Sequence, residues 1–222
     1  MVDAAIQRAR KTLFEGNIVP WGFHPRDSDF EPVFEDHDHN AVDSAVLKQV
    51  DVKHLKALLP FSTSHTNEAY ILNLTRSGLI TIIACSATGF SYGLTTLTQL
   101  FFRHTSGKVY TNLAPIYITD APKYGHRGLN LDVSRSFYAV EHIERTLGAM
   151  AYNKMNRLHL HITDSQAWPL EVPSLPDLAR KGAYQPGMIY SVEDLERIQK
   201  YGALLGIEVG GKSFRSVCSI RD

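Results

Sequence analysis

The spacing of apolar residues along the first 120 positions predicts two helices and a group of strands. The helices are expected over residues 4–14 and 89–102, and the strands over residues 45–52, 69–74 and 79–84, with one or two more over residues 108–119. The run Thr75-Arg76-Ser77-Gly78 has the length and the glycine of a hairpin connection between two of these strands. Strands joined by a hairpin and covered by a helix form a small α+β layer. Pro122 then interrupts the pattern, which predicts a domain boundary near residue 120.

Beyond that boundary, strand-like and helix-like segments alternate. Strands are expected over residues 127–133, 157–163 and 207–209, and helices over residues 140–152 and 191–206. Ser191 and Asp194 form an imperfect capping box at the start of the last helix. The order β-α-β-α-β favours a parallel sheet. A closed (β/α)8 barrel takes about 250 residues, so this part of the chain has room for fewer than three of its units.

A cluster of polar residues is predicted at one edge of this sheet. His159 and His161 point to the same face of their strand, because side chains two residues apart share a face. Asp164 follows at the carboxyl end of that strand, and Asp132 and Arg135 lie at the end of the preceding one. Sites in parallel α/β folds form at this end of the strands. The planar fork of an arginine is well suited to bind neighbouring sugar hydroxyls.

Two other interpretations of the cluster remain open at this point. In the first, Asp132 and Arg135 form a structural ion pair and the histidines satisfy backbone groups. In the second, His159 and His161 begin a metal site, as His-x-His does in metal-dependent barrel hydrolases, although no third ligand follows at a comparable strand end. His37 and His39 alternate with aspartates, a pattern more typical of a charged loop than of a metal site.

Composition narrows the choice of partners. Lys+Arg and Asp+Glu number 23 each, so no basic field is available to attract nucleic acid or anionic lipid. No apolar stretch is long enough for a membrane-spanning helix, and charges within the first ten residues argue against a signal peptide. Cys85 and Cys218 are too few and too far apart for a disulfide framework or a zinc site.

Several long runs resemble the β-N-acetylhexosaminidases, family 20 of the glycoside hydrolases. Residues 126–135 (HRGLNLDVSR) resemble the first strand of that family's barrel, and residues 150–171 (MAYNKMNRLHLHITDSQAWPLE) resemble the second strand and its following loop. Residues 115–122 (PIYITDAP) are similar to the link between its N-terminal domain and the barrel. Residues 19–26 (VPWGFHPR) and 93–101 (GLTTLTQLF) resemble the fungal branch. The resemblance covers about residues 4–209.

The resemblance implies a fold and a reaction. Residues 1–120 would form an α+β domain, residues 121–209 the first two to three βα units of a (β/α)8 TIM barrel, and residues 210–222 an unmatched tail. The family removes terminal β-linked N-acetylglucosamine or N-acetylgalactosamine, including from chitin oligomers, with the substrate's own acetamido oxygen as nucleophile. It needs no cofactor or metal, its members are often dimeric, and it is typical of secreted or lysosomal and vacuolar proteins.

The resemblance also implies roles for four residues. Arg135 would bind hydroxyls of the terminal sugar, Asp132 would orient Arg135, and His161 with Asp164 would form the polar network beside the acid. The family's general acid and its partner form an Asp-Glu pair on the fourth strand, and that dipeptide occurs nowhere in this sequence. We therefore expect a truncated hexosaminidase with no catalytic residue present, inactive on its own.

Two further expectations concern the N-terminal segment. Asn73-Leu74-Thr75 is an N-glycosylation sequon, which makes Asn73 a candidate glycosylation site. An alternative to the enzyme is a non-catalytic carbohydrate-binding module built on residues 1–120.

Overall fold

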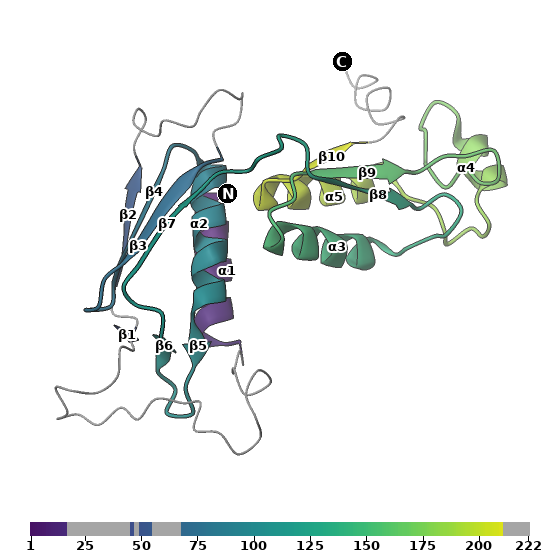
Figure 1. Ribbon diagram of the computed structural model, residues 1–222. Coiled ribbons are helices and arrows are strands. Elements are labelled where there is room, and N and C mark those ends of the chain that lie inside the picture. The colour runs from purple at the N-terminus through teal and green to yellow at the C-terminus, as the bar shows by residue number, and fades with distance from the viewer. Residues whose placement is uncertain (17–44, 47–48, 55–67, 211–222) are drawn as a thin grey trace. The chain divides into compact units, whose positions relative to one another are not determined.

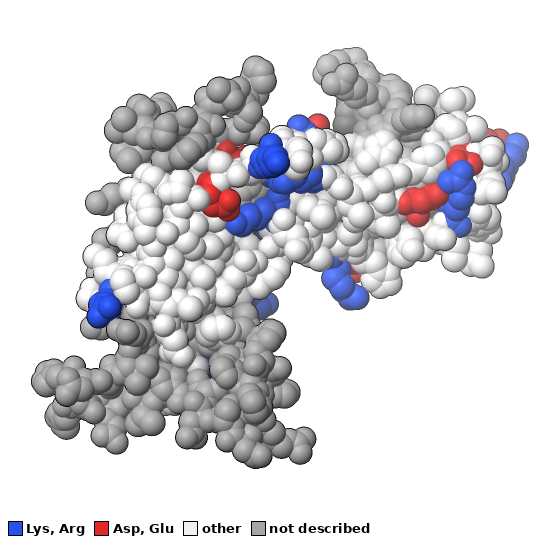
Figure 2. Space-filling view, in the orientation of Figure 1, with Lys and Arg blue, Asp and Glu red and all other residues white. Residues whose placement is uncertain are grey.

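The computed structural model describes residues 1–16, 45–46, 49–54 and 68–210 (Figure 1). It divides into two compact units, one over residues 2–125 and one that begins at residue 126. The tract with His37 and His39, Cys218, and all but the first residue of the tail over 210–222 lie outside the described residues. No helix in the described ranges is long and apolar enough to cross a membrane. On the face shown in Figure 2, charged residues form separate groups, several of them with both signs.

The N-terminal unit is an α+β layer, as the sequence predicts. Its elements are α1 (Val2–Phe14), β1 (Ala45–Val46), β2 (Gln49–His54), β3 (Tyr70–Leu74), β4 (Leu79–Ala84), α2 (Ala87–Leu100), β5 (Phe102–Arg103), β6 (Val109–Thr111) and β7 (Ile116–Asp120). The main sheet has the order β2-β4-β3-β7, with β2 parallel to β4 and the other neighbours antiparallel. Gly78, at a φ of 79°, closes the predicted hairpin between β3 and β4.

Two of the segments predicted as strand in this unit each hold two strands. Of the one or two strands expected over residues 108–119, the structure has two, β6 and β7, which belong to different sheets. Pro115 lies between them and has no N–H to donate to a ladder, so the pairing breaks there. The predicted strand over residues 45–52 likewise corresponds to two short strands, β1 and β2, again in different sheets.

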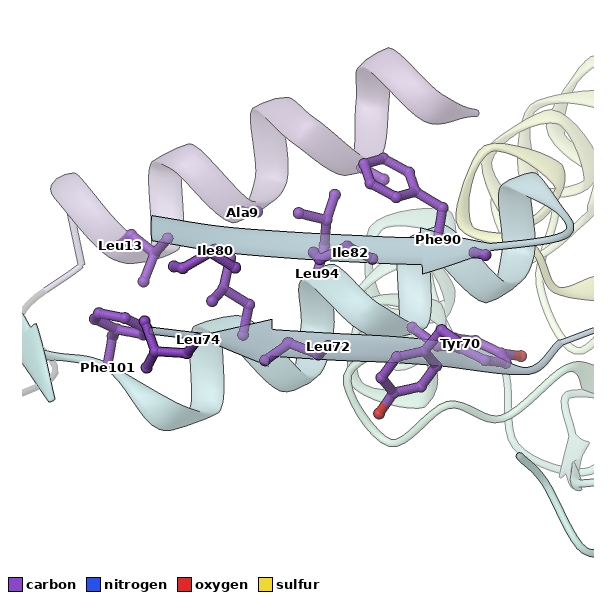
Figure 3. Close-up of a cluster of buried hydrophobic side chains, with 14 of the residues drawn as sticks. Ala9, Leu13, Tyr70, Leu72, Leu74, Ile80, Ile82, Phe90, Leu94 and Phe101 are labelled. Carbon is purple, nitrogen blue, oxygen red and sulfur yellow. The ribbon is translucent and has the colours of Figure 1, made fainter. Parts of the chain in front are cut away.

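Helices cover one face of the main sheet. Leu72 and Leu74 of β3 and Ile80 and Ile82 of β4 are fully buried, whereas the residues between them are only half-buried. Their side chains meet residues from α2, including Phe90 and Leu94, and from α1, including Ala9 and Leu13 (Figure 3). The alternation of buried and half-buried positions follows from the two-residue period of a strand, and it leaves the opposite face of the sheet outside this core.

The second unit holds a parallel sheet. Its elements are β8 (Gly128–Asp132), α3 (Val140–Tyr152), β9 (Arg157–His161), α4 (Pro176–Gly182), α5 (Val192–Leu205) and β10 (Glu208–Gly210). The strand order is β10-β9-β8, with both pairs parallel. Leu158 and Leu160 of β9 are buried against apolar residues of α3 and α5, which lie along the same side of the strands (Figure 1). The sheet is open, and no closed barrel is present among the described residues.

The ends of α5 show how local sequence fixes this unit. The capping box at its start is complete rather than imperfect: the Asp194 N–H donates to Ser191 Oγ over 3.1 Å, and the Ser191 N–H donates to the Asp194 carboxylate over 3.0 Å. The side chain of aspartate is shorter than that of the glutamate usual at this position, but it still accepts the hydrogen bond from the N-cap N–H. Gly206 ends the helix in the left-handed conformation, at a φ of 77°, and the chain turns into β10.

The sequence pattern missed α4. This helix has seven residues and only Ala179 is buried, so it offers no apolar periodicity that could be recognised. Its start is nevertheless typical, because Pro176 occupies the first turn, where a missing N–H costs nothing.

Two glycines in the helices of the second unit should respond in opposite ways to alanine. A Cβ at Gly202 would lie 2.6 Å from Val209 Cγ2 and 2.9 Å from the Ile207 carbonyl oxygen, whereas a Cβ at Gly148 would meet nothing within 4 Å. Gly202→Ala should therefore lower the free energy of unfolding by about 1–3 kcal/mol. Gly148→Ala should raise it by about 0.5–1 kcal/mol, because alanine favours the helix. Denaturant unfolding of both variants checks this, and a stabilising Gly202→Ala would contradict the packing of α5 on β10.

Candidate functional site

The four residues singled out in the sequence lie together at the carboxyl ends of β8 and β9. The Arg135 guanidinium donates from Nη1 to Asp132 Oδ2 over 2.5 Å and from Nη2 to Asp164 Oδ2 over 2.6 Å. The same oxygen of Asp164 lies 2.9 Å from His161 Nε2. The parallel register places Asp132 directly opposite His161, so the loops that follow the two strands begin at the same level.

Gln166, which no sequence pattern singles out, completes the surroundings of Arg135. Its side-chain oxygen accepts a hydrogen bond from Arg135 Nε over 2.9 Å. A guanidinium has five N–H donors, and the bonds to Asp132, Asp164 and Gln166 use three of them. One N–H on each terminal nitrogen is left without a partner in the described part of the chain. Arg135 therefore holds two donors at a fixed spacing, and its side chain is 48% exposed.

Hydrogen bonds of the backbone at residues 133–135 fix the position of Arg135. The Val133 and Ser134 N–H groups both donate to the His161 carbonyl oxygen, over 3.0 and 3.1 Å, so the chain leaving β8 stays attached to the end of β9. Asp132 Oδ1 accepts from the backbone N–H groups of Ser134 and Arg135 over 3.1 and 3.0 Å, which is an Asx-type turn. One carboxylate thus fixes both the backbone and the side chain of Arg135.

A second connection joins the two loops directly. Ser134 is buried, and its hydroxyl donates to the Ala167 carbonyl oxygen over 2.8 Å. The same carbonyl oxygen accepts from the Asp164 N–H over 2.9 Å. Ser134 therefore sets the distance between the loop that carries Arg135 and the loop that carries Asp164. Nothing in the strand pattern indicates this role, because it depends on the conformation of both loops.

Both carboxylates of the site are ionised at neutral pH. The hydrogen bond from His161, the hydrogen bond from Ser165 and the charge of Arg135 lower the pKa of Asp164 to about 2. Hydrogen bonds from the backbone and side chain of Arg135 lower the pKa of Asp132 as well. An ionised carboxylate only accepts hydrogen bonds, so His161 must present a protonated Nε2 to Asp164. These groups can bind and orient a ligand, but neither carboxylate holds a proton to donate.

The two histidines of β9 have different surroundings, and neither matches the alternative roles expected for it. His159 is exposed on the face of the sheet opposite α3 and α5, and His161 contacts a carboxylate rather than a backbone group. In the described part of the chain, no three or more His, Cys, Asp or Glu residues lie together in a way that could hold a metal ion.

A hollow of about 750 Å3 opens beside the site, between the loop after β9 and α4. Asp164 and Gln166, which both contact Arg135, also line this hollow. Trp168 forms part of its wall, and the Trp168 N–H of the backbone is bonded to the Gly182 carbonyl oxygen over 2.8 Å, which fixes the end of α4 against the loop. The missed helix α4 therefore shapes the surface next to the predicted site.

Two family models match the chain. The model of "Glycosyl hydrolase family 20, catalytic domain" matches residues 124–211, which include every residue of the site, and the model of "beta-acetyl hexosaminidase like" proteins matches residues 1–100. The chain belongs to glycosyl hydrolase family 20. This membership favours a glycosidase over the metal-dependent barrel hydrolase, and the match over residues 1–100 favours a hexosaminidase N-terminal domain over an independent carbohydrate-binding module.

Individual proteins similar to this chain are named as β-hexosaminidases and β-N-acetylglucosaminidases. A β-hexosaminidase of Arthroderma benhamiae is 40% identical over 208 residues, which cover 94% of this chain and 34% of the relative. A chitooligosaccharidolytic β-N-acetylglucosaminidase of Bombyx mori is 39% identical over 129 residues, which cover 58% of this chain and 22% of the relative. The chain thus spans about a third or less of the length of these curated relatives.

Solved structures of the family share the fold. The chitobiase of Flavobacterium johnsoniae matches with a TM-score of 0.68 and 30% identity, over 95% of this chain and 29% of that chain. A mutant Streptomyces plicatus β-hexosaminidase in complex with its product GlcNAc matches with a TM-score of 0.67 and 26% identity, over 94% of this chain and 38% of that chain.

The depressed pKa of Asp164 predicts how the family 20 site responds to acid. A carboxylate whose pKa falls from 3.8 to about 2 on folding stabilises the folded state at pH values above 3.8 and loses this effect as the pH falls toward 2. Asp164→Asn should therefore lower the melting temperature by a constant amount between pH 7 and pH 5, and by less as the pH falls below 4.

The control for this pH series is Asp177→Asn. Asp177 lies on α4, and within the described ranges its ion pairs are with the exposed side chains of Arg180 and Lys181, so its replacement should change the melting temperature little. An Asp164→Asn effect that stays the same down to pH 3 would contradict the charged cluster.

Proposed function

We propose that this chain carries the part of a β-N-acetylhexosaminidase that binds the terminal sugar. In this proposal residues 1–120 form the N-terminal α+β domain, residues 121–209 form the first two to three βα units of a (β/α)8 barrel, and residues 210–222 form a tail outside both. The observation that carries the proposal is Arg135, held between Asp132 and Asp164 with two N–H donors left over. A planar cation with two donors at a fixed spacing fits the neighbouring hydroxyls of a pyranose.

The proposed substrate is a glycan or oligosaccharide that ends in β-linked N-acetylglucosamine or N-acetylgalactosamine, including chitin oligomers. The names of relatives support this choice: one is a chitooligosaccharidolytic β-N-acetylglucosaminidase, and one solved structure holds GlcNAc as product. Other relatives are named as subunits, such as β-hexosaminidase subunit B1 of Dictyostelium discoideum, which supports an oligomeric enzyme.

The proposed reaction is a retaining hydrolysis in which the substrate supplies the nucleophile. The acetamido oxygen forms a bond to the anomeric carbon while the glycosidic bond breaks, and a general acid protonates the leaving oxygen. Water then opens the cyclic intermediate with retention of configuration. Holding the sugar rigidly favours this step, because an intramolecular nucleophile gains effective concentration only when its geometry is fixed. Arg135 would hold the sugar in this way by binding its hydroxyl groups.

Within this reaction the other residues are positioning residues. Asp132 would hold Arg135 through its backbone and its side chain together. Asp164 would accept hydrogen bonds from both Arg135 and His161. Its negative charge would then balance the charge of the arginine before the neutral sugar binds. Neither carboxylate can serve as the general acid, because the pKa of each is lowered.

The purified 222-residue chain should not hydrolyse a chromogenic N-acetylglucosaminide. Its sequence contains no Asp-Glu dipeptide, which is the family's acid and orienting pair, and the carboxylates of the described site remain ionised. Release of the chromogen, measured by absorbance and lost on Arg135→Ala, would contradict this expectation. Release that persists in Arg135→Ala would instead indicate a contaminating enzyme.

A chimera tests the role of Arg135. Residues 1–209 of this chain would replace the corresponding segment of the Arthroderma benhamiae β-hexosaminidase, which supplies the rest of the enzyme. The chimera should release N-acetylglucosamine, and Arg135→Ala should lower kcat/KM by about a hundredfold or more, because two charge-assisted hydrogen bonds are lost. Arg135→Lys should recover little of this loss, since an ammonium cannot reproduce the planar fork.

The matched control in the chimera is Arg145→Ala. Arg145 is an exposed arginine on α3, and it lies outside the described cluster. Its replacement should leave kcat/KM unchanged. Equal kcat/KM values for Arg135→Ala and Arg145→Ala would contradict the proposed function of the site.

A further inference from the structure

The main sheet of the N-terminal unit has a second face, opposite α1 and α2, that its apolar core does not use. Leu72 and Leu74 of β3 point into the core with no exposed surface, so Asn73 between them points to the opposite face. Asn73 is half-buried there, in the third of the four strands β2-β4-β3-β7 (Figure 1). Ile71 and Ile83 lie on the same face and are also only half-buried.

Tyr117 is the cross-strand neighbour of Asn73 on β7. The two are direct partners in the antiparallel register, which puts their Cβ atoms about 4.5–5.5 Å apart. Tyr117 is 68% exposed, so its ring is accessible on this face of the sheet. On the other side of Asn73 its partner is the small residue Thr81 of β4. No side-chain hydrogen bond of Asn73 or Tyr117 is found within the described ranges.

The sequence around Asn73 makes it an acceptor for a glycan. Asn73-Leu74-Thr75 is the one Asn-x-Ser/Thr sequon in all 222 residues. We propose that Asn73 is an N-glycosylation site and that the first N-acetylglucosamine of its glycan lies on the ring of Tyr117. Asn73 and Arg135 belong to different units of the chain, and the proposal does not depend on the proposed function.

The modification is a group transfer from an oligosaccharide carried on a polyprenyl diphosphate. The Asn73 side-chain nitrogen forms a bond to C1 of the first N-acetylglucosamine, and the bond from that carbon to the diphosphate oxygen breaks. The amide nitrogen loses one proton to a base of the transferring enzyme, and the polyprenyl diphosphate leaves. No oxidant or reductant is needed.

The position of Tyr117 gives the first sugar a place to bind. One face of an N-acetylglucosamine ring presents C–H groups, and the negative face of an aromatic ring attracts them. A sugar attached at Asn73 would also cover the half-buried Ile71 and Ile83, which are otherwise apolar surface without a partner in the core. β7 is an edge strand of this sheet, and a bulky glycan beside it would block pairing with another chain.

Translation of the full chain with ER microsomes tests the attachment. The chain would carry an added export signal and one added sequon after residue 222 as an internal control for transfer. Intact mass should show two glycans on the wild type and on Thr75→Ser, but one on Asn73→Gln and on Thr75→Ala. A single glycan on the wild-type chain, located at the added sequon, would overturn the proposal.

Two glycosidases test the contact with Tyr117, because endoglycosidase H leaves the first N-acetylglucosamine on Asn73 and peptide-N-glycosidase removes it. Tyr117→Ala should lower the melting temperature of the glycoprotein, and it should lower that of the endoglycosidase H product by the same amount. The decrease should be clearly smaller in the peptide-N-glycosidase product, which has lost the first sugar. Tyr152→Ala, an exposed tyrosine on α3, should have the same effect in all three forms. An equal effect of Tyr117→Ala in all three forms would overturn the placement of the sugar on the ring.

Discussion

The hydrogen-bonded ion pairs of Arg135 with Asp132 and Asp164 are the interaction on which the candidate site depends. The pair with Asp164 joins residues that are 29 positions apart in the chain and that follow two different strands, whereas Asp132 lies three positions before Arg135, at the end of β8. The parallel register of β8 and β9 makes this possible, because it brings the carboxyl ends of both strands to the same level. With three of its five N–H donors held by protein, the guanidinium keeps one orientation and presents the other two outward.

The rest of the second unit supports this arrangement from behind. Leu158 and Leu160 anchor β9 in the core on one face, so His161 at the strand end is carried on the other face by the two-residue alternation. Ser134, buried against the carbonyl of Ala167, then fixes the two loops to each other. A site assembled in this way holds Arg135 in position through contacts within the protein itself, which favours binding of a sugar in one orientation. The two carboxylates balance the charge of Arg135, but neither can act as a general acid, because the pKa of each is lowered.

Sequence reasoning predicted those features of this unit that follow from periodicity. The alternation in β9 and the position of Asp164 after it indicated that His161 and Asp164 would meet Asp132 and Arg135, and the structure brings all four together. Gln166 and Ser134 were not predicted, because their contacts depend on how two irregular loops fold against each other. The short helix α4 was missed for a related reason: with one buried residue it has no apolar face to recognise. In the N-terminal unit, the sequence left open whether residues 108–119 hold one strand or two, because apolar residues on both sides of Pro115 look continuous although the backbone pairing is not.

The most direct measurement is a crystal structure of the chain soaked with N-acetylglucosamine. The sugar should lie over Arg135, with two ring hydroxyls within hydrogen-bond distance of its terminal nitrogens. Asp132 and Asp164 should still hold the guanidinium. A sugar bound away from Arg135, or an Arg135 side chain that leaves both carboxylates and turns into solvent, would contradict the account.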